Sequence, residues 1–270
     1  MAAGGELVLV GCGRMGGALL GGWMAHPAWR ERISVLDPAA NPSGVRKLTG
    51  AADLAAFPGP LTIVLAVKPD LVLQALDGVC DYLGPGDLVI SIAAGVTLEA
   101  LDGRCGGASL VRAMPNTPAA VRRGITAAVA GPRLTEIQRD LCEVLFGMVG
   151  ELVWLSGEHQ IDAATALSGS GPAYFFHLGE VLAEAGIRLG LEPETAARLA
   201  YMTLVGAGAL AGESAEDLAV LRAGVTSPGG TTAAALAVFD DSQALAELAF
   251  AAAAAGAVRS RDLSGAGALA

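Results

Sequence analysis

The sequence is poor in lysine, histidine and clustered basic residues. Only Lys47 and Lys68 are lysines among 17 basic residues, and 27 acidic residues give a formal net charge of -10. Because nucleic-acid binding needs concentrated Lys and Arg to neutralise phosphates, we expect no nucleic-acid partner. The three histidines, His26, His159 and His177, lack metal-ligand spacing, so no metal site is predicted.

Cysteine pairs and long apolar runs are also missing. The four cysteines, at positions 12, 80, 105 and 142, form no C-x-x-C pattern, which favours free thiols in a reducing cytosol. No apolar stretch reaches about eighteen residues without Gly, Pro or a charge, as a membrane-spanning helix requires. No basic leader precedes Glu6. The prediction is a soluble cytoplasmic protein with no membrane partner.

What is present is enough apolar sequence for a large folded core. The chain has 270 residues, of which 53% are hydrophobic, and this excludes general disorder. Up to about residue 155, short β-rich runs alternate with helical stretches, the order typical of a doubly wound parallel sheet with right-handed crossovers. The predicted strands are 6–10, 32–36, 61–67, 88–92, 109–113, 126–130 and 151–155. Helices are predicted from Met15, from Pro69, near Thr97 and over 135–146.

After Ser156 the strand signals stop. The fold class is therefore α/β followed by all-α: a Rossmann-type dinucleotide-binding domain over 1–156 and a helical substrate-binding and dimerisation domain over 157–270. The predicted helix 194–211 carries no charge after Arg198. A helix that is apolar on every side must be buried on every side. Either a partner subunit covers it or it is the core helix of its own domain.

A glycine turn follows the first predicted strand. Gly11, Gly13 and Gly16 have the G-x-G-x-x-G spacing, which allows a tight turn, close approach of a pyrophosphate, and helix-to-strand packing. The helix start adds N–H groups and a partial positive charge. Asp37 ends the second strand about twenty residues later, where a carboxylate binds the adenosine ribose. The predicted cofactor contacts here are Val10, Gly11, Cys12, Gly13, Arg14, Met15 and Asp37.

Three more turns follow predicted strands at the edge where open α/β sheets bind ligands. Lys68 in the first turn favours a cofactor or substrate contact over a simple surface charge. Small residues at 93–95 allow a nicotinamide to lie flat. Asn116, between two prolines, either bonds the nicotinamide amide or belongs to a rigid turn. The predicted cofactor contacts in these turns are Ala66, Val67, Lys68, Pro69, Ala93, Ala94 and Asn116.

The segment 225–232 reads Val-Thr-Ser-Pro-Gly-Gly-Thr-Thr and leads directly into a predicted helix. Two glycines and two threonines at a helix start present successive N–H groups and hydroxyls to a small anion such as a carboxylate. An ordinary N-cap needs one Ser or Thr, so ligand binding is favoured over capping. A comparable turn at 168–172 is assigned to packing and subunit contact.

Together these segments resemble one known family. AVKP at 66–69, SIAAGVT at 91–97, MPNTP at 114–118, SGSGPAY at 168–174 and VTSPGGTT at 225–232, in this order behind GCGRMG, are similar to pyrroline-5-carboxylate reductase over nearly the whole chain. The resemblance implies hydride transfer from NADH or NADPH to the cyclic imine 1-pyrroline-5-carboxylate, giving L-proline. It also implies a homodimer, often gathered into a decamer.

The resemblance also implies roles for particular residues. The loop holds the substrate carboxylate through backbone N–H groups, Thr232 lies near the ring nitrogen, and Glu158 contacts the same nitrogen. The implied substrate-binding residues are Val225, Ser227, Gly230, Thr231, Thr232 and Glu158, with Thr232 and Glu158 also catalytic.

Two positions depart from the family pattern. Many members have a small or basic residue where this chain has Asp37, whose charge repels the extra phosphate of NADPH, so NADH is predicted to be preferred unless Arg46 or Arg32 offsets the repulsion. The segment 222–224 reads Arg-Ala-Gly where the family usually has Lys, Asp and a further polar residue, and this puts one loop contact in doubt.

Two alternatives remain for comparison. A β-hydroxyacid dehydrogenase needs a lysine in its helical domain, and no lysine follows Lys68. A non-catalytic dinucleotide sensor has no use for a second anion pocket, so the intact segment 225–232 argues against it.

Overall fold

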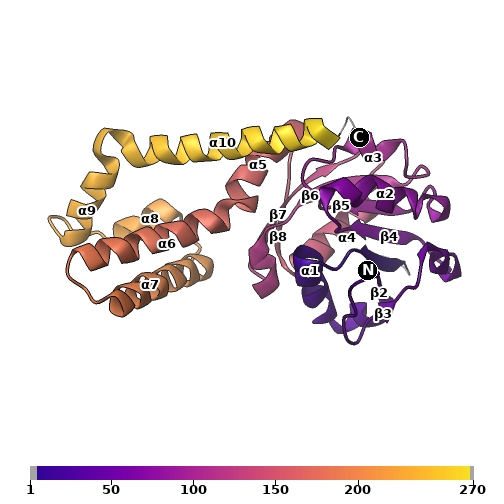
Figure 1. Ribbon diagram of the computed structural model, residues 1–270, viewed down its shortest axis with the longest axis horizontal. Helices are drawn as coiled ribbons and strands as arrows, with labels where there is room; N and C mark the ends of the chain where they lie inside the picture. The colour runs from indigo at the N-terminus through magenta and orange to yellow at the C-terminus, as the bar shows by residue number, and fades with distance from the viewer. Residues whose placement is uncertain (1–4, 268–270) are drawn as a thin grey trace. The chain divides into compact units, whose positions relative to one another are not determined.

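The computed structural model describes residues 5–267, which form two compact units (Figure 1). Unit 1 comprises Met1–Ser170 and Ala255–Ala270, and unit 2 comprises Gly171–Ala254. This division differs from the predicted boundary at 156/157. Residues 157–170 belong to unit 1, and the end of the last helix also belongs there, since Ser260 donates a hydrogen bond to Asp162 (2.6 Å).

Unit 1 is built on an eight-stranded sheet with the order β3-β2-β1-β4-β5-β6-β7-β8. Strands β1 to β6 are mutually parallel, β7 is antiparallel to β6, and β8 is parallel to β7. The fold class predicted from the sequence is confirmed. The strands are β1 Glu6–Val10, β2 Ile33–Leu36, β3 Arg46–Lys47, β4 Leu61–Leu65, β5 Leu88–Ser91, β6 Ser109–Met114, β7 Gly124–Ala130 and β8 Gly150–Trp154.

Helices cover both faces of this sheet, which is why its central strands are apolar at nearly every position. Leu7 and Leu9 of β1 pack on one face with α1 and α4, whereas Val8 and Val10 pack on the other with α2 and α3. The helices are α1 Arg14–Met24, α2 Val72–Asp77, α3 Leu98–Asp102, α4 Glu136–Gly147 and α5 Ile161–Ala164.

Three features of the sheet depart from the prediction. Strands β7 and β8 run opposite to the others, because the connection 115–123 after β6 is shorter than the dozen or so residues of a parallel crossover. The two-residue strand β3 was not predicted, since Arg46 and Lys47 are charged and exposed. Strand β4 also ends at Leu65, two residues earlier than expected.

Unit 2 is helical, as predicted. Its helices are α6 Gly171–Arg188, α7 Pro193–Glu213, α8 Leu218–Gly224 and α9 Thr231–Asp240. The last helix, α10, spans Ala244–Gly267, and its residues up to Ala254 belong to unit 2. Helices α6 and α7 pack side by side (Figure 1). In α7 only Ala196 is buried. The apolar helix predicted over 194–211 is therefore not enclosed as a core helix by the rest of unit 2. Large apolar side chains remain exposed on both helices, including Phe175, Leu178, Leu182, Leu199, Met202 and Val205.

Residues 5–267 contain neither a candidate membrane span nor a candidate metal cluster. No helix in this range is long and apolar enough to cross a membrane. The same range contains no group of three or more His, Cys, Asp or Glu side chains that could hold a metal ion.

Candidate functional site

The predicted cofactor residues of unit 1 lie where the parallel strands end. The strand order reverses between β1 and β4, and ligands of open α/β sheets bind at the carboxyl edge of such a reversal. There the loops after the two strands run side by side, since the Ala66 N–H donates to the Val10 carbonyl (2.7 Å). The structure therefore brings the glycine turn next to the segment 66–69.

The three glycines of the turn have different physical roles. Gly11 has φ +89°, and a Cβ on it would lie 2.7 Å from Val67 Cγ1. A Cβ on Gly16 would lie 2.5 Å from the Gly11 carbonyl oxygen, so this glycine allows close helix-to-strand packing. A Cβ on Gly13 would meet no atom within 4 Å. The chain itself does not explain Gly13, whereas a phosphate lying against its backbone does.

Helix α1 begins immediately after Gly13, and its first turn fits an anion. Gly13 is the N-cap and provides no side-chain hydrogen bond, and the first turn has no acidic residue. The first N–H groups of a helix need outside acceptors, and the positive end of the helix dipole favours a negative one. A dinucleotide pyrophosphate satisfies both requirements, with the exposed Arg14 beside it.

Asp37 ties this turn to the end of β2. Its Oδ2 accepts a hydrogen bond from the Cys12 N–H (2.7 Å), and its Oδ1 accepts from the backbones of Ala39 (2.8 Å) and Ala40 (2.9 Å). Partial burial favours a higher pKa, but these backbone hydrogen bonds and the charge of Lys47 outweigh it and hold the pKa of Asp37 below its usual value. The carboxylate is thus negatively charged at neutral pH, at the position expected for the ribose.

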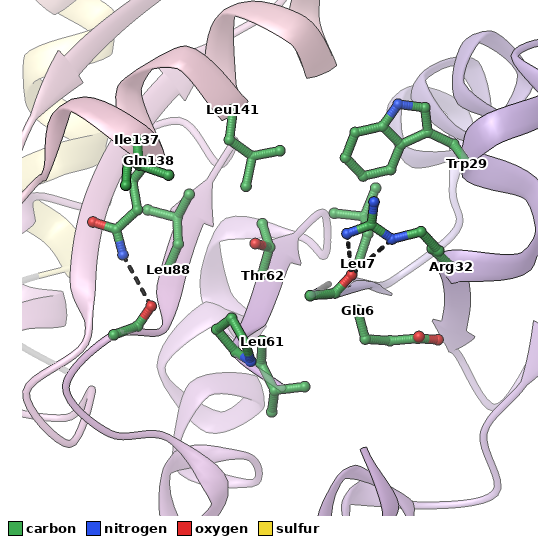
Figure 2. A pocket seen from close by; sticks show the side chains of 13 residues that line it. Glu6, Leu7, Trp29, Arg32, Leu61, Thr62, Leu88, Ile137, Gln138 and Leu141 are labelled. Atoms are coloured by element: carbon green, nitrogen blue, oxygen red, sulfur yellow. Dashed lines mark hydrogen bonds between the residues drawn. The ribbon is translucent and has the colours of Figure 1, made fainter. Parts of the chain in front are cut away.

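Both arginines considered as partners of an extra phosphate are engaged near the amino ends of the strands. Arg32 donates to the Gly5 carbonyl (2.7 and 3.1 Å), and Arg46 pairs with Glu6 (3.2 Å). Arg32 also lines a cavity of about 260 Å³, with Trp29 and Thr62 (Figure 2). None of the predicted site residues lines this cavity.

The turns after β4 and β5 differ in how exposed their residues are. Lys68 and Pro69 are exposed, so the lysine is accessible to a ligand. Ala93 is buried and Ala94 half-buried. Gly95 has φ +79°, and a Cβ there would lie 2.9 Å from the Leu263 carbonyl, so the end of α10 packs directly on this turn.

Asn116 holds the connection between β6 and β7. Its Oδ1 accepts from the Ile125 N–H (2.9 Å), and its Nδ2 donates to the Ser168 carbonyl (3.1 Å). The sequence left open whether Asn116 bonds the nicotinamide amide or belongs to a rigid turn. These two hydrogen bonds favour the rigid turn. The buried carboxamide joins the MPNTP segment to Ser168, which lies in a π-helical turn over Thr165–Gly169.

Glu158 makes a partly buried ion pair that the sequence did not reveal. Its Oε1 accepts from Arg112 Nη1 (2.6 Å) and from the Leu98 N–H (2.9 Å). Arg112 interrupts the apolar strand β6, and this charge in a buried run was the available signal. Lys47 was likewise missed as the neighbour of Asp37, because its short strand was not predicted.

The predicted substrate residues other than Glu158 lie in unit 2, in the loop between α8 and α9 and at the first two positions of α9. Gly229 has φ +70°, and the Gly230 N–H donates to the Ser227 carbonyl (3.0 Å). Gly230 is the N-cap of α9 and makes no side-chain cap, so the N–H groups of Thr231 and Thr232 face outward from the helix start. The Thr226 hydroxyl instead donates to the Arg222 carbonyl (2.6 Å) and joins this loop to the end of α8. The loop can thus hold a small carboxylate.

The four cysteines are free thiols, as predicted. Burial raises the pKa of Cys142 to about 12, so this thiol stays protonated at neutral pH. Burial and the nearby Asp37 raise the pKa of Cys12, in the glycine turn. Neither thiol has the lowered pKa of a nucleophile.

The chain is similar to known proteins over most of its length. Residues 158–263 match the family model described as pyrroline-5-carboxylate reductase dimerisation. A pyrroline-5-carboxylate reductase from Pseudomonas aeruginosa is 39% identical over 246 residues, which cover 87% of this chain and 88% of that protein.

Solved structures extend the likeness to the whole fold. A pyrroline-5-carboxylate reductase from Coxiella burnetii is 36% identical, with a TM-score of 0.88 over 96% of this chain and 98% of its own. The NADP-bound enzyme from Plasmodium falciparum is 28% identical, with a TM-score of 0.80 over 96% of this chain and 98% of its own. The chain belongs to the pyrroline-5-carboxylate reductase family.

Proposed function

We propose that the protein reduces 1-pyrroline-5-carboxylate to L-proline with NADH or NADPH and that NADH is the preferred cofactor. The observation that supports this most is that α1 and α9 both start after a glycine N-cap without a side-chain cap, as two separate anion sites require. Gly13 and α1 fit a pyrophosphate, and Gly230 and α9 fit a small carboxylate. A protein that only binds a dinucleotide needs the first site and not the second.

The proposed chemistry relies on positioning more than on proton transfer. The N–H groups of Thr231 and Thr232 bind the substrate carboxylate, with Val225, Ser227 and Gly230 shaping the same loop, since the Gly230 N–H donates to the Ser227 carbonyl. The Thr232 hydroxyl and the Glu158 carboxylate face the ring nitrogen and favour its protonated, cationic form. The bound nicotinamide supplies the hydride to the imine carbon, and the protonated nitrogen becomes the secondary amine of proline. Holding the reactants in line can supply about 7 kcal/mol or more.

The proposed cofactor contacts follow the carboxyl edge of the sheet. The turn from Val10 to Met15 holds the pyrophosphate, Asp37 the ribose, and the segments 66–69 and 93–94 the nicotinamide side. Asn116 keeps the last turn in place.

A direct assay separates this enzyme from a redox sensor. NADH absorbance is followed with and without 1-pyrroline-5-carboxylate. We expect loss of absorbance only when the imine is present, with proline as the product. Binding of NADH without any imine-dependent oxidation would favour the sensor.

Removing the Thr232 hydroxyl tests the loop. We expect Thr232→Ala to lower kcat/KM for the imine about tenfold, the effect of one hydrogen bond of roughly 1.4 kcal/mol, while NADH affinity and Tm stay unchanged. Thr203→Ala, an exposed threonine of α7 in the same unit, is the matched control. Unaltered imine kinetics in Thr232→Ala would remove this hydroxyl from the site.

The cofactor preference is tested at Asp37. A phosphate about 4 Å from this carboxylate is repelled by roughly 1 kcal/mol in water and about 4 kcal/mol at a partly shielded surface, and Arg32 and Arg46 are held elsewhere. We expect Asp37→Ser to shift the ratio of kcat/KM for NADPH over NADH upward by about tenfold or more. Steady-state rates with both cofactors give this ratio.

Asp53→Ser is the matched control for that experiment. Asp53 also accepts backbone hydrogen bonds, from Thr49 (2.6 Å) and Gly50 (3.4 Å), which lower its pKa in the same way. It lies outside the glycine turn, so its loss is expected to leave the cofactor ratio as it is. An equal shift in both variants would mean that Asp37 acts through stability and not through the ribose.

Assembly and location complete the proposal. We assign dimerisation and the binding of the substrate carboxylate to unit 2, the part Gly171–Ala254 of the predicted domain 157–270, in a homodimer that can gather into a decamer. A cytoplasmic location is supported by the four free thiols, since oxidising compartments favour disulfides.

A further inference from the structure

Arg112 occupies a position where an apolar residue is expected. It lies on β6, between Ser91 of β5 and Val129 of β7, and its side chain is only 2% exposed. Every residue of β6 is buried. A buried guanidinium is costly unless it is paired, and replacing buried ion pairs with apolar residues is often neutral or stabilising. Stability alone is therefore a weak reason for this arginine.

The guanidinium is also used incompletely. Nη1 binds Glu158 Oε1, but Nε and Nη2 are buried without a hydrogen-bond partner. An arginine serving only to hold the fold together is expected to use more of its five N–H groups, since each buried unpaired donor costs stability. The single hydrogen bond of Arg112 does fix the position of one carboxylate oxygen, Glu158 Oε1.

That oxygen is fixed from two sides. Besides Arg112, the Leu98 N–H at the first residue of α3 donates to the same Oε1. Within the described residues no hydrogen bond is made by Oε2, and the Glu158 side chain is 29% exposed. The pair thus has a buried cation and a partly open carboxylate.

Glu158 also lies near the turn assigned to the nicotinamide. Ile161, three residues after Glu158, packs in one apolar cluster with Leu98 and Ala94. The fixed carboxylate and the turn 93–95 therefore belong to the same small region of unit 1.

From this arrangement we infer that Arg112, together with the Leu98 amide, is a positioning element that holds Oε1 of Glu158 so that Oε2 is presented to the nitrogen of the cyclic iminium. The inference rests on the proposed function and adds to it the residues that orient the carboxylate. A glutamate with one oxygen anchored has lost its side-chain rotational freedom before the substrate binds, so this ordering no longer opposes catalysis.

The Leu98 amide can be removed with little other change. Proline is well tolerated at the first residue of a helix, and the preceding Thr97, at φ -82° and ψ 158°, already has a conformation compatible with a following proline. Leu98→Pro removes the N–H and the leucine side chain, whereas Leu98→Ala removes only the side chain. Comparing the two isolates the amide.

The experiment measures imine kinetics, NADH affinity and Tm for Leu98→Pro and Leu98→Ala. The same measurements are made for Arg112→Met, Arg112→Lys, Glu158→Gln and the double variant Arg112→Met/Glu158→Gln. We expect Arg112→Met to lower kcat/KM for the imine about tenfold, with partial recovery in Arg112→Lys and an unchanged Kd for NADH. The kcat/KM of Leu98→Pro for the imine should be lower than that of Leu98→Ala, because only the proline variant also lacks the N–H. Once Glu158 is glutamine, losing Arg112 should lower kcat/KM by less than about twofold.

Three results would overturn the inference in an active wild-type protein: unchanged imine kinetics in Arg112→Met, losses that multiply in the double variant, or an equal loss of NADH affinity. If Arg112→Met does not fold, the Leu98 pair and Arg112→Lys decide the question by the same criteria. Failure of the proposed function is distinguishable, because the wild-type protein itself would then show no imine-dependent oxidation of NADH.

Discussion

Gly13→Val is expected to weaken NADH binding by about 100-fold or more, equivalent to roughly 2.8 kcal/mol, without unfolding the protein. Gly13 has φ -71° and ψ -159°, an extended conformation that valine adopts readily, and its Cβ position is open. The added side chain therefore fills the space that the pyrophosphate is proposed to occupy. Titration calorimetry with NADH gives the affinity, and thermal unfolding without cofactor gives the stability.

Two other glycines serve as controls for this result. Gly21→Ala adds a methyl group to the same helix, where it meets nothing within 4 Å, and is expected to leave NADH affinity unchanged. Gly11→Ala is expected to destabilise the protein itself, since φ is +89° and the methyl group would lie 2.8 Å from the Ala66 carbonyl oxygen. Wild-type affinity in Gly13→Val would contradict the assignment of this turn to the pyrophosphate.

Met202→Glu is expected to convert the proposed dimer into monomers at micromolar concentration. Met202 is 52% exposed on α7, between the exposed Leu199 and Val205. On α6, Phe175, Leu178 and Leu182 form a second exposed apolar row. Monomeric proteins rarely expose so much contiguous apolar surface, and each such side chain contributes about 1.5–3 kcal/mol when fully buried. A glutamate at this position must lose its hydration in the dimer, so it opposes association.

Molar mass by light scattering, measured over a dilution series, tests this prediction. Ile137→Glu is the matched control, because Ile137 is also exposed but lies on α4 of unit 1, outside the dimerisation region. We expect the control to keep the wild-type mass. A wild-type monomer, or a Met202→Glu dimer as tight as the wild type, would show that α7 is not the interface.

The local elements were predictable because each carries its own physical signal. Strand β1 was predicted at its observed bounds, since the apolar run 7–10 follows Glu6 and is closed by a glycine turn. Helix α4 was predicted within one residue at each end, because Thr135 and Gln138 form a capping box in the sequence itself. The direction of β7 was not predictable in this way, because it depends on how the chain turns after β6 and not on the composition of the strand.

The features of the candidate site likewise fall into those with a local sequence signal and those that depend on long-range contacts. The glycine turn and the position of Asp37 follow from the sequence alone, and so does the prediction of two anion-binding helix starts, because backbone N–H groups at a helix start need no distant partner to bind an anion. The folded chain was needed to show that Asn116 holds a turn, that Arg32 and Arg46 are engaged away from Asp37, and that Arg112 pairs with Glu158. These contacts join residues 27 to 52 positions apart, and no local pattern reports which distant side chain a folded sheet will bring to a given charge.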